Sequence, residues 1–133
     1  AGGQALARYL LDHPHEVAGK RVLDFAAGSG LVGIAAMKAG GASVLCADID
    51  PFCEAAVRAN ASANGVRLDF TDSNLLDGEP PAVDVICAGD ICYERELAAQ
   101  VIGALTFQVG GNHTSLDLSI AHDQALFQRT RPA

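Results

Sequence analysis

The chain has 133 residues, which is room for one domain. Half of its residues are hydrophobic but only 5% are aromatic, so the core must consist of alanine, valine, leucine and isoleucine, as is normal for α/β proteins. A net charge of -7 and a pI near 4.8 leave no broad basic surface for a phosphate backbone. The charge therefore argues against nucleic acid as the main partner and favours a basic or neutral protein substrate.

Targeting signals and cysteines give few further clues. The sequence has no secretory signal peptide and no long apolar run, so we expect a location in the cytoplasm or in an organelle matrix, and no membrane association. Its opening residues, A-G-G-Q, are typical of the interior of a longer protein. The cysteines have no zinc-site spacing, and we interpret them as reduced and structural. They are Cys46, Cys53, Cys87 and Cys92.

The first predicted elements are a helix, a strand and a second helix. Apolar residues recur at helical spacing over residues 4–11, and His13-Pro14 ends that run. Residues 22–25 are mainly apolar, which is typical of a strand covered on both faces. A glycine turn follows the strand, and residues 31–38 then form a helix.

The turn after this strand has the pattern G-x-G-x-x-G. Gly28 and Gly30 permit turn conformations and the close approach of a ligand, while Gly33 lets the next helix pack tightly on the strand. That helix directs free N–H groups and the positive end of its dipole at the turn, which suits a carboxylate or phosphate. The segment is therefore predicted to bind a nucleotide-like cofactor.

Two acids indicate which cofactor this is. A second strand, residues 43–47, ends at Asp48, where a carboxylate can accept hydrogen bonds from ribose hydroxyls. Asp24 lies four residues before Gly28, a place where the pyrophosphate of a dinucleotide would repel it. An acid there suits a positively charged ligand, such as the ammonium and sulfonium of S-adenosylmethionine. We therefore favour S-adenosylmethionine over NAD.

A third helix follows the second strand. Asp50 and Pro51 predict its start, with the acid as N-cap and the proline in the first turn. The helix is predicted to run to Asn64, with Gly65 as its C-cap. Asn60 and Asn64 lie four residues apart on one face, and we interpret both as solvated side chains.

The remaining pattern predicts the fold class. Further elements are a strand over residues 66–70, a strand over 84–88 and a helix over 94–105. Such alternation predicts an α/β, Rossmann-like, doubly wound and mainly parallel sheet, with helices on both faces and ligands at the carboxyl ends of the strands.

The C-terminal part is less regular. Residues 115–120 alternate enough for one strand, and residues 124–132 resemble a polar tail. We therefore divide the chain into a cofactor-binding core, residues 1–107, and an atypical or incomplete C-terminal segment, residues 108–133.

Four segments of the chain resemble class I S-adenosylmethionine-dependent methyltransferases. They read A-G-G-Q-A-L-A-R-Y-L-L-D, V-L-D-F-A-A-G-S-G-L-V-G-I-A-A, A-D-I-D-P and A-G-D-I-C-Y. The combination of G-G-Q with G-D-x-x-Y is narrower: it resembles the seven-β-strand lysine methyltransferases, above all those that act on the β-subunit of electron transfer flavoprotein and their bacterial relatives. The resemblance covers about residues 1–105.

The resemblance implies a set of cofactor-binding residues. Those that would line the methionine part are Asp24, Gly28 and Gly30. Those on the adenosine side would be Asp48 at the ribose, Ile49 against adenine and Asn74 at the adenine amine. Ala26 and Gly89 complete the set.

On the acceptor side, the resemblance implies that Asp90 and Tyr93 are the catalytic residues and that residues 2–4 close over the site. A lysine must attack as the neutral amine, yet its ordinary pKa of about 10.4 leaves little of that form at pH 7. Asp90 would orient the ammonium and accept its proton. The alternatives are a helix N-cap for Asp90 and ordinary packing for Tyr93.

The chain also departs from this family. Ala26 stands where its members usually carry glycine, and a later strand with a G-D-P-G-R-like loop is not found after residue 105. The main hypothesis is methyl transfer to a protein lysine, with the β-subunit of electron transfer flavoprotein as the substrate. Two alternatives stay open: an NAD-dependent oxidoreductase domain and a non-catalytic cofactor-binding half-domain.

Overall fold

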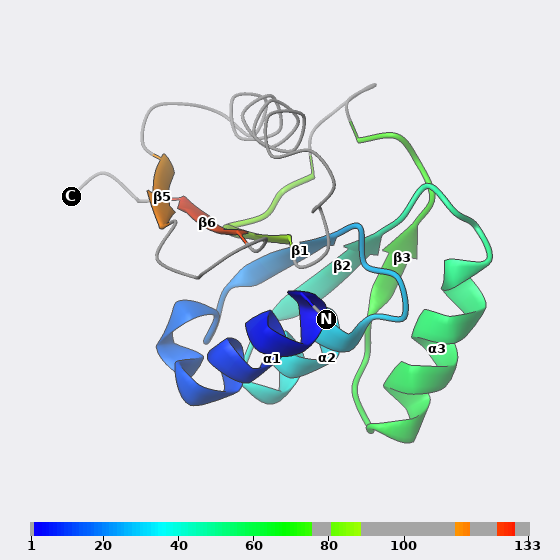
Figure 1. The fold of residues 1–133 in the computed structure, drawn as a ribbon, viewed down its shortest axis with the longest axis horizontal. Helices are drawn as coiled ribbons and strands as arrows, with labels where there is room; N and C mark the ends of the chain where they lie inside the picture. The colour runs from blue at the N-terminus through cyan, green and yellow to red at the C-terminus, as the bar shows by residue number, and fades with distance from the viewer. Residues whose placement is uncertain (1, 76–80, 89–113, 118–124, 130–133) are drawn as a thin grey trace.

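The computed structural model describes residues 2–75, 81–88, 114–117 and 125–129. Its helices lie against a twisted sheet (Figure 1). They are α1 (Gly2–Asp12), the 3₁₀ helix η1 (Pro14–Glu16), α2 (Leu31–Lys38) and α3 (Cys53–Ala63). The strands are β1 (Arg21–Phe25), β2 (Ser43–Ala47), β3 (Asp69–Thr71), β4 (Val85–Ala88), β5 (Thr114–Asp117) and β6 (Ala125–Arg129).

The described strands form one sheet in the order β3-β2-β1-β4-β6-β5. The first four are parallel, whereas β6 pairs antiparallel with both β4 and β5. Parallel neighbours need a crossover over one face of the sheet, and α2 and α3 supply those between β1, β2 and β3. The predicted fold class, an α/β and Rossmann-like sheet that is mainly parallel, is confirmed.

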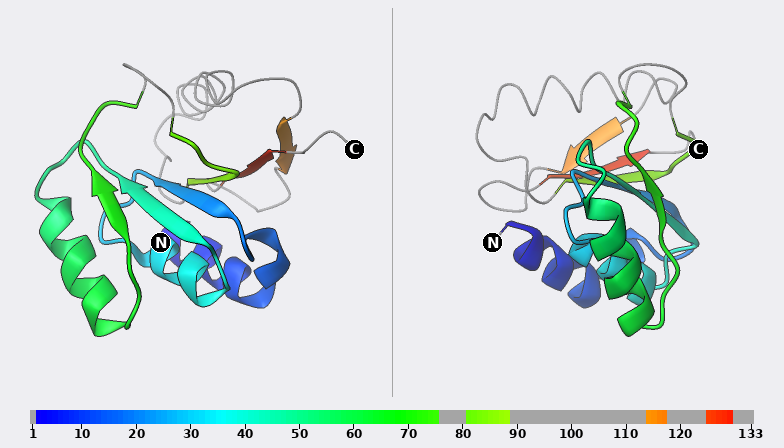
Figure 2. Two further views of the ribbon diagram at one scale, coloured as in Figure 1. Left: turned by 180° about the vertical axis from the view of Figure 1, so that it is seen from behind. Right: turned by 90° about the vertical axis from the view of Figure 1, so that its right-hand side faces the viewer.

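α1 and α2 pack together on one side of the sheet (Figure 2). α1 is amphipathic, since Leu6 and Leu10 lie four residues apart on one face and are both fully buried. α2 is apolar on nearly every side, and five of its eight residues are buried. Such a helix needs cover all round, and α1 on one side with β1 and β2 on the other provide it.

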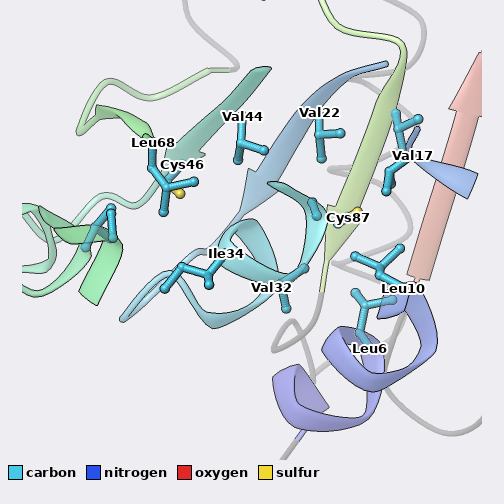
Figure 3. Packing of buried hydrophobic residues seen from close by; sticks show 14 residues of the cluster. Leu6, Leu10, Val17, Val22, Val32, Ile34, Val44, Cys46, Leu68 and Cys87 are labelled. Carbon is cyan, nitrogen blue, oxygen red and sulfur yellow. The ribbon is translucent and has the colours of Figure 1, made fainter. Parts of the chain in front are cut away.

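The main core lies between the sheet and these helices (Figure 3). The helices α1, α2 and α3 contribute buried side chains to it, and so do the strands β1, β2 and β4. Its buried members from the strands are Val22, Val44, Cys46, Val85 and Cys87. Burying one valine or leucine side chain stabilises a fold by about 1.5–3 kcal/mol, so this cluster is the chief source of stability among the described residues.

A second buried cluster lies on the other face of the sheet. It contains Leu23, Ala47, Ile86 and Ala88, which alternate along their strands with the members of the main core. Strands that are apolar on both faces are typical of parallel sheets with both faces covered. The helix predicted over residues 94–105 lies outside the described residues.

An ion pair fixes the register between β1 and β4. The Arg21 guanidinium donates to both carboxylate oxygens of Asp84, from Nε at 3.1 Å and from Nη2 at 3.0 Å, and its backbone N–H donates to the same group at 3.0 Å. The Asp84 backbone N–H donates in return to the Arg21 carbonyl at 2.8 Å. These bonds align Val22 with Val85 at the amino ends of the two strands.

The largest differences between the predicted elements and the structure are in α3, β3 and β6. α3 begins at Cys53, two residues after Pro51, because the Asp50 carboxylate accepts the Phe52 N–H at 2.9 Å in a preceding turn. β3 begins only at Asp69, since the Val66 N–H bonds to Ala61 in the end of α3. The prediction of a polar tail is wrong for residues 125–129, because these residues form β6. The predicted domain boundary at residue 107 lies outside the described residues.

The described part of the chain contains no helix with the length and apolar character needed to cross a membrane. Within the same residues, no three histidine, cysteine, aspartate or glutamate side chains gather into a group that could hold a metal ion.

Two buried thiols make stability depend on pH. Burial raises the pKa of Cys46 and of Cys87, and the Asp24 carboxylate, aligned with both on the strand between them, raises each further. The folded protein keeps these protons, whereas an unfolded chain loses them near pH 8.5. We expect the free energy of unfolding to be unaffected by the thiols below about pH 8 and to fall above it, by up to ~1.4 kcal/mol per pH unit for each thiol.

Urea unfolding between pH 7 and pH 10 measures this slope. The double variant Cys46→Ala/Cys87→Ala serves as the control. It lacks both thiols, so its free energy of unfolding should fall less steeply with pH than that of the wild type. Equal slopes in the two proteins would show that other groups cause the alkaline loss.

Candidate functional site

The carboxyl ends of the parallel strands meet at one edge of the sheet. Phe25 at the end of β1 is aligned with Ala47 on β2 and with Ala88 on β4, and Ala47 is aligned with Thr71 on β3. The segments that follow these strands therefore start at one level. Ligands of open parallel sheets bind at this edge, so the predicted site residues that are described lie where the topology places a ligand.

The loop between β1 and α2 has three residues with positive φ. Gly28 has a φ of 54° and Gly30 a φ of 87°, as predicted from the glycine pattern. Ala26 has a φ of 56°, although it carries a Cβ. A Cβ built on Gly28 meets no atom within 4 Å, so the space in front of this residue is open.

The Asp24 carboxylate lies beneath this loop and is only 1% exposed. Its Oδ2 accepts a hydrogen bond from the Gly33 N–H in the first turn of α2, at 2.9 Å. A Cβ on Gly33 would lie 3.0 Å from the Cys46 sulfur, which confirms that this glycine lets the helix pack tightly. Asp24 thus ties α2 to β1, while its predicted contact with the cofactor stays a prediction.

Asp48, directly after β2, holds the loop from the side. Its Oδ2 accepts the Gly28 N–H at 3.0 Å, and its Oδ1 accepts the Asp50 N–H at 3.0 Å. The side chain is half-buried, and its carboxylate also accepts a hydrogen bond from the Cys53 thiol, which leaves it capacity for a further donor. The structure therefore brings Asp48 and the glycine loop together, as the sequence predicts.

Burial raises the pKa of the neighbouring Cys53 thiol, and the carboxylates of Asp48 and Asp50 raise it further. This thiol therefore stays protonated at neutral pH, in agreement with its interpretation as a structural rather than a nucleophilic cysteine.

α3 supplies a contact that sequence reasoning missed. The Asn60 Nδ2 donates to the Ser29 carbonyl oxygen at 2.9 Å, so the interpretation of Asn60 as a solvated side chain is wrong. Asn64 does behave as predicted: it is exposed, and its Nδ2 bonds to the Asn60 carbonyl oxygen at 2.8 Å within the end of the helix.

The adenosine side of the predicted site is exposed. Ile49 is 81% exposed and available for an apolar ligand. Phe52, which the sequence analysis did not single out, is 86% exposed three residues later. Asn74 is also exposed, in the segment after β3. The other predicted site residues, Gly89, Asp90 and Tyr93, lie outside the described residues.

Ala26 offers a test of the loop geometry. A left-handed conformation costs a residue with a Cβ about 1–2 kcal/mol, whereas glycine adopts it freely. We expect Ala26→Gly to raise the free energy of unfolding by about 0.5–1 kcal/mol, since the extra freedom of glycine in the unfolded chain offsets part of the gain. Urea denaturation measures this change, and a loss of stability would contradict the left-handed conformation.

The parallel sheet, the glycine loop after β1 and the acid after β2 define a Rossmann-like domain with a candidate nucleotide-type site at its carboxyl edge. Comparison with known proteins narrows this class to methyltransferases. The family model of the ribosomal protein L11 methyltransferases (PrmA) matches residues 5–105, and the chain belongs to this family. The resemblance to class I methyltransferases is thereby confirmed.

Curated relatives include two kinds of protein methyltransferase. The electron transfer flavoprotein beta subunit lysine methyltransferase of Xenopus laevis is 46% identical over 98 residues, covering 73% of this chain and 40% of that protein. The human protein of the same name is 41% identical, covering 73% and 37%. The ribosomal protein L11 methyltransferase of Aeromonas hydrophila is 44% identical over 91 residues, covering 66% and 31%. The chain thus spans two fifths or less of the length of these relatives.

Solved structures show the same fold. The ribosomal protein L11 methylase of Lactobacillus delbrueckii subsp. bulgaricus has a TM-score of 0.62 at 22% identity, covering 96% of this chain and 77% of that chain. Protein arginine methyltransferase 10 of Arabidopsis thaliana has a TM-score of 0.69 at 23% identity, covering 84% and 33%.

Proposed function

We propose that this chain binds S-adenosylmethionine at the carboxyl edge of its sheet and transfers the methyl group to a lysine side chain of a protein. The substrate that we propose is the β-subunit of electron transfer flavoprotein, which is named in relatives that are 41–46% identical. The observation that carries the cofactor proposal is the contact between Asp48 and Gly28, at 3.0 Å, beside open space.

The described residues fit such a cofactor. Asp48 keeps acceptor capacity for a ribose hydroxyl, and Ile49, the next residue, presents an exposed apolar side chain to a base. In front of Gly28 there is room for the methionine part, because the place of a side chain is empty. The pyrophosphate of NAD would have to occupy the same space, so the room in front of Gly28 does not distinguish the two cofactors.

Methyl transfer makes modest demands on the protein. When bound, S-adenosylmethionine supplies a methyl group on a positively charged sulfur. A nucleophile attacks the methyl carbon directly, and the sulfur leaves as the neutral thioether of S-adenosylhomocysteine. The protein has to align the lysine amine with that methyl group and exclude water. In our proposal Asp90 holds the lysine ammonium and receives its proton, and Tyr93 forms part of the acceptor wall.

Calorimetric titration with S-adenosylhomocysteine and with NAD tests the cofactor. We expect S-adenosylhomocysteine to bind and NAD not to bind. The reverse result would favour the hypothesis of an NAD-dependent oxidoreductase domain. Transfer of labelled methyl groups to the purified β-subunit of electron transfer flavoprotein then tests the substrate, with ribosomal protein L11 as the comparison. Labelling of L11 alone would overturn the substrate proposal.

The cytoplasmic location stays a prediction.

A further inference from the structure

The glycine loop is held by α3 as well as by the strands. The hydrogen bond from Asn60 Nδ2 to the Ser29 carbonyl oxygen, at 2.9 Å, joins residues that are 31 positions apart. Ser29 stands between Gly28 and Gly30, the two glycines whose positive φ angles shape the turn. The bond from α3 therefore reaches the middle of the loop that faces the proposed cofactor.

The same side of α3 restricts the loop by its shape. Val57 lies three residues before Asn60, hence on the same helix face, and is fully buried. A Cβ on Gly30 would lie 3.3 Å from a methyl group of Val57. α3 thus bonds to Ser29 and leaves little room for a side chain at Gly30, the next loop residue.

Three consecutive loop residues are each held by a hydrogen bond, two of them from outside the loop. Gly28 donates to Asp48 at 3.0 Å, Ser29 accepts from Asn60 at 2.9 Å, and the Gly30 N–H donates to Ala27 at 2.9 Å. In a trans peptide the C=O and N–H groups point in opposite directions. The bond from Asn60 therefore holds the carbonyl side of the peptide between Ser29 and Gly30, while the bond from the Gly30 N–H to Ala27 holds its other side.

We propose that Asn60 is a positioning residue of the cofactor site: its amide fixes the Ser29–Gly30 peptide, so that the loop keeps its open conformation before the ligand arrives. This inference rests on the proposed function. Pre-organisation of this kind raises affinity because the loop need not be ordered when the ligand binds.

The experiment is a titration of S-adenosylhomocysteine into the wild type, Asn60→Ala and Asn60→Asp. Asn60→Asp keeps the size of the side chain but replaces the donor with an acceptor. We expect both variants to bind about fivefold more weakly, in line with one hydrogen bond. Asn64→Ala is the matched control, because it removes an amide from the same helix that does not contact the loop, and its affinity should stay within about twofold of the wild type.

Hydrogen exchange without cofactor separates positioning from simple stabilisation. Amides of residues 26–31 should exchange faster in both Asn60 variants and at the wild-type rate in Asn64→Ala. If Asn60→Ala does not fold, Asn60→Asp decides. Unchanged affinity in folded Asn60 variants overturns this inference alone, even if their melting temperatures fall. A wild type that does not bind S-adenosylhomocysteine overturns the proposed function and this inference with it.

Discussion

The variant Gly28→Val is expected to stay folded and to bind S-adenosylhomocysteine at least about a hundredfold more weakly than the wild type. Gly28 has a φ of 54°, which a β-branched residue resists, and a Cβ there would meet no protein atom within 4 Å. The added methyl groups would therefore occupy the space that we assign to the cofactor. Calorimetric titration and thermal unfolding measure the two effects separately.

Gly65→Val is a matched control for this experiment. Gly65 has a φ of 66°, and a Cβ on it also meets nothing within 4 Å, but it lies just after α3 and not in the loop. Both valines should lower stability through the same backbone strain, by about 1–2 kcal/mol. Only the substitution in the loop should remove binding. A folded Gly28→Val protein with normal affinity would show that the cofactor lies elsewhere.

The sequence predicts the first half of the fold well because its signals there are local. The bounds of α2 and β2 agree with the prediction, since an apolar run ends at a glycine or at a polar turn in each case. β1 gains only Arg21 at its start. The start of α3 differs because two signals compete: proline favours the first helical turn, but the Asp50 carboxylate first closes a turn onto Phe52.

Contacts between distant residues explain what the sequence does not predict. Residues 125–129 have no alternation of apolar and polar positions that would indicate a strand by itself, and they form one because β4 offers an edge to pair with, as in the pairing of Ile86 with Phe127. The partner of Asn60 is likewise a backbone carbonyl 31 residues away, which no local pattern reveals. Asp48 could be predicted for the opposite reason: an acid at the end of the second strand has a fixed spacing from the glycine turn.

Asp48→Ala is expected to weaken the binding of S-adenosylhomocysteine by about a hundredfold, or ~2.7 kcal/mol. Two losses combine in this variant. The loop loses the bond between the Gly28 N–H and the carboxylate, and the ribose hydroxyls lose a charged acceptor, which contributes about 1.5–3 kcal/mol per hydrogen bond. Asp50→Ala is the control, because the Asp50 side chain bonds to the Phe52 N–H and, within the part of the chain that the structure describes, not to the glycine loop.

An analogue of S-adenosylhomocysteine without the ribose hydroxyls separates the two losses at Asp48. If the carboxylate binds the hydroxyls, the analogue should bind the wild type weakly, and Asp48→Ala should weaken the analogue by a smaller factor than S-adenosylhomocysteine, because only the loss of the loop bond remains. If Asp48 acts only through the loop, the substitution should weaken both ligands by the same factor. A folded Asp48→Ala variant with wild-type affinity for S-adenosylhomocysteine would remove Asp48 from the site altogether.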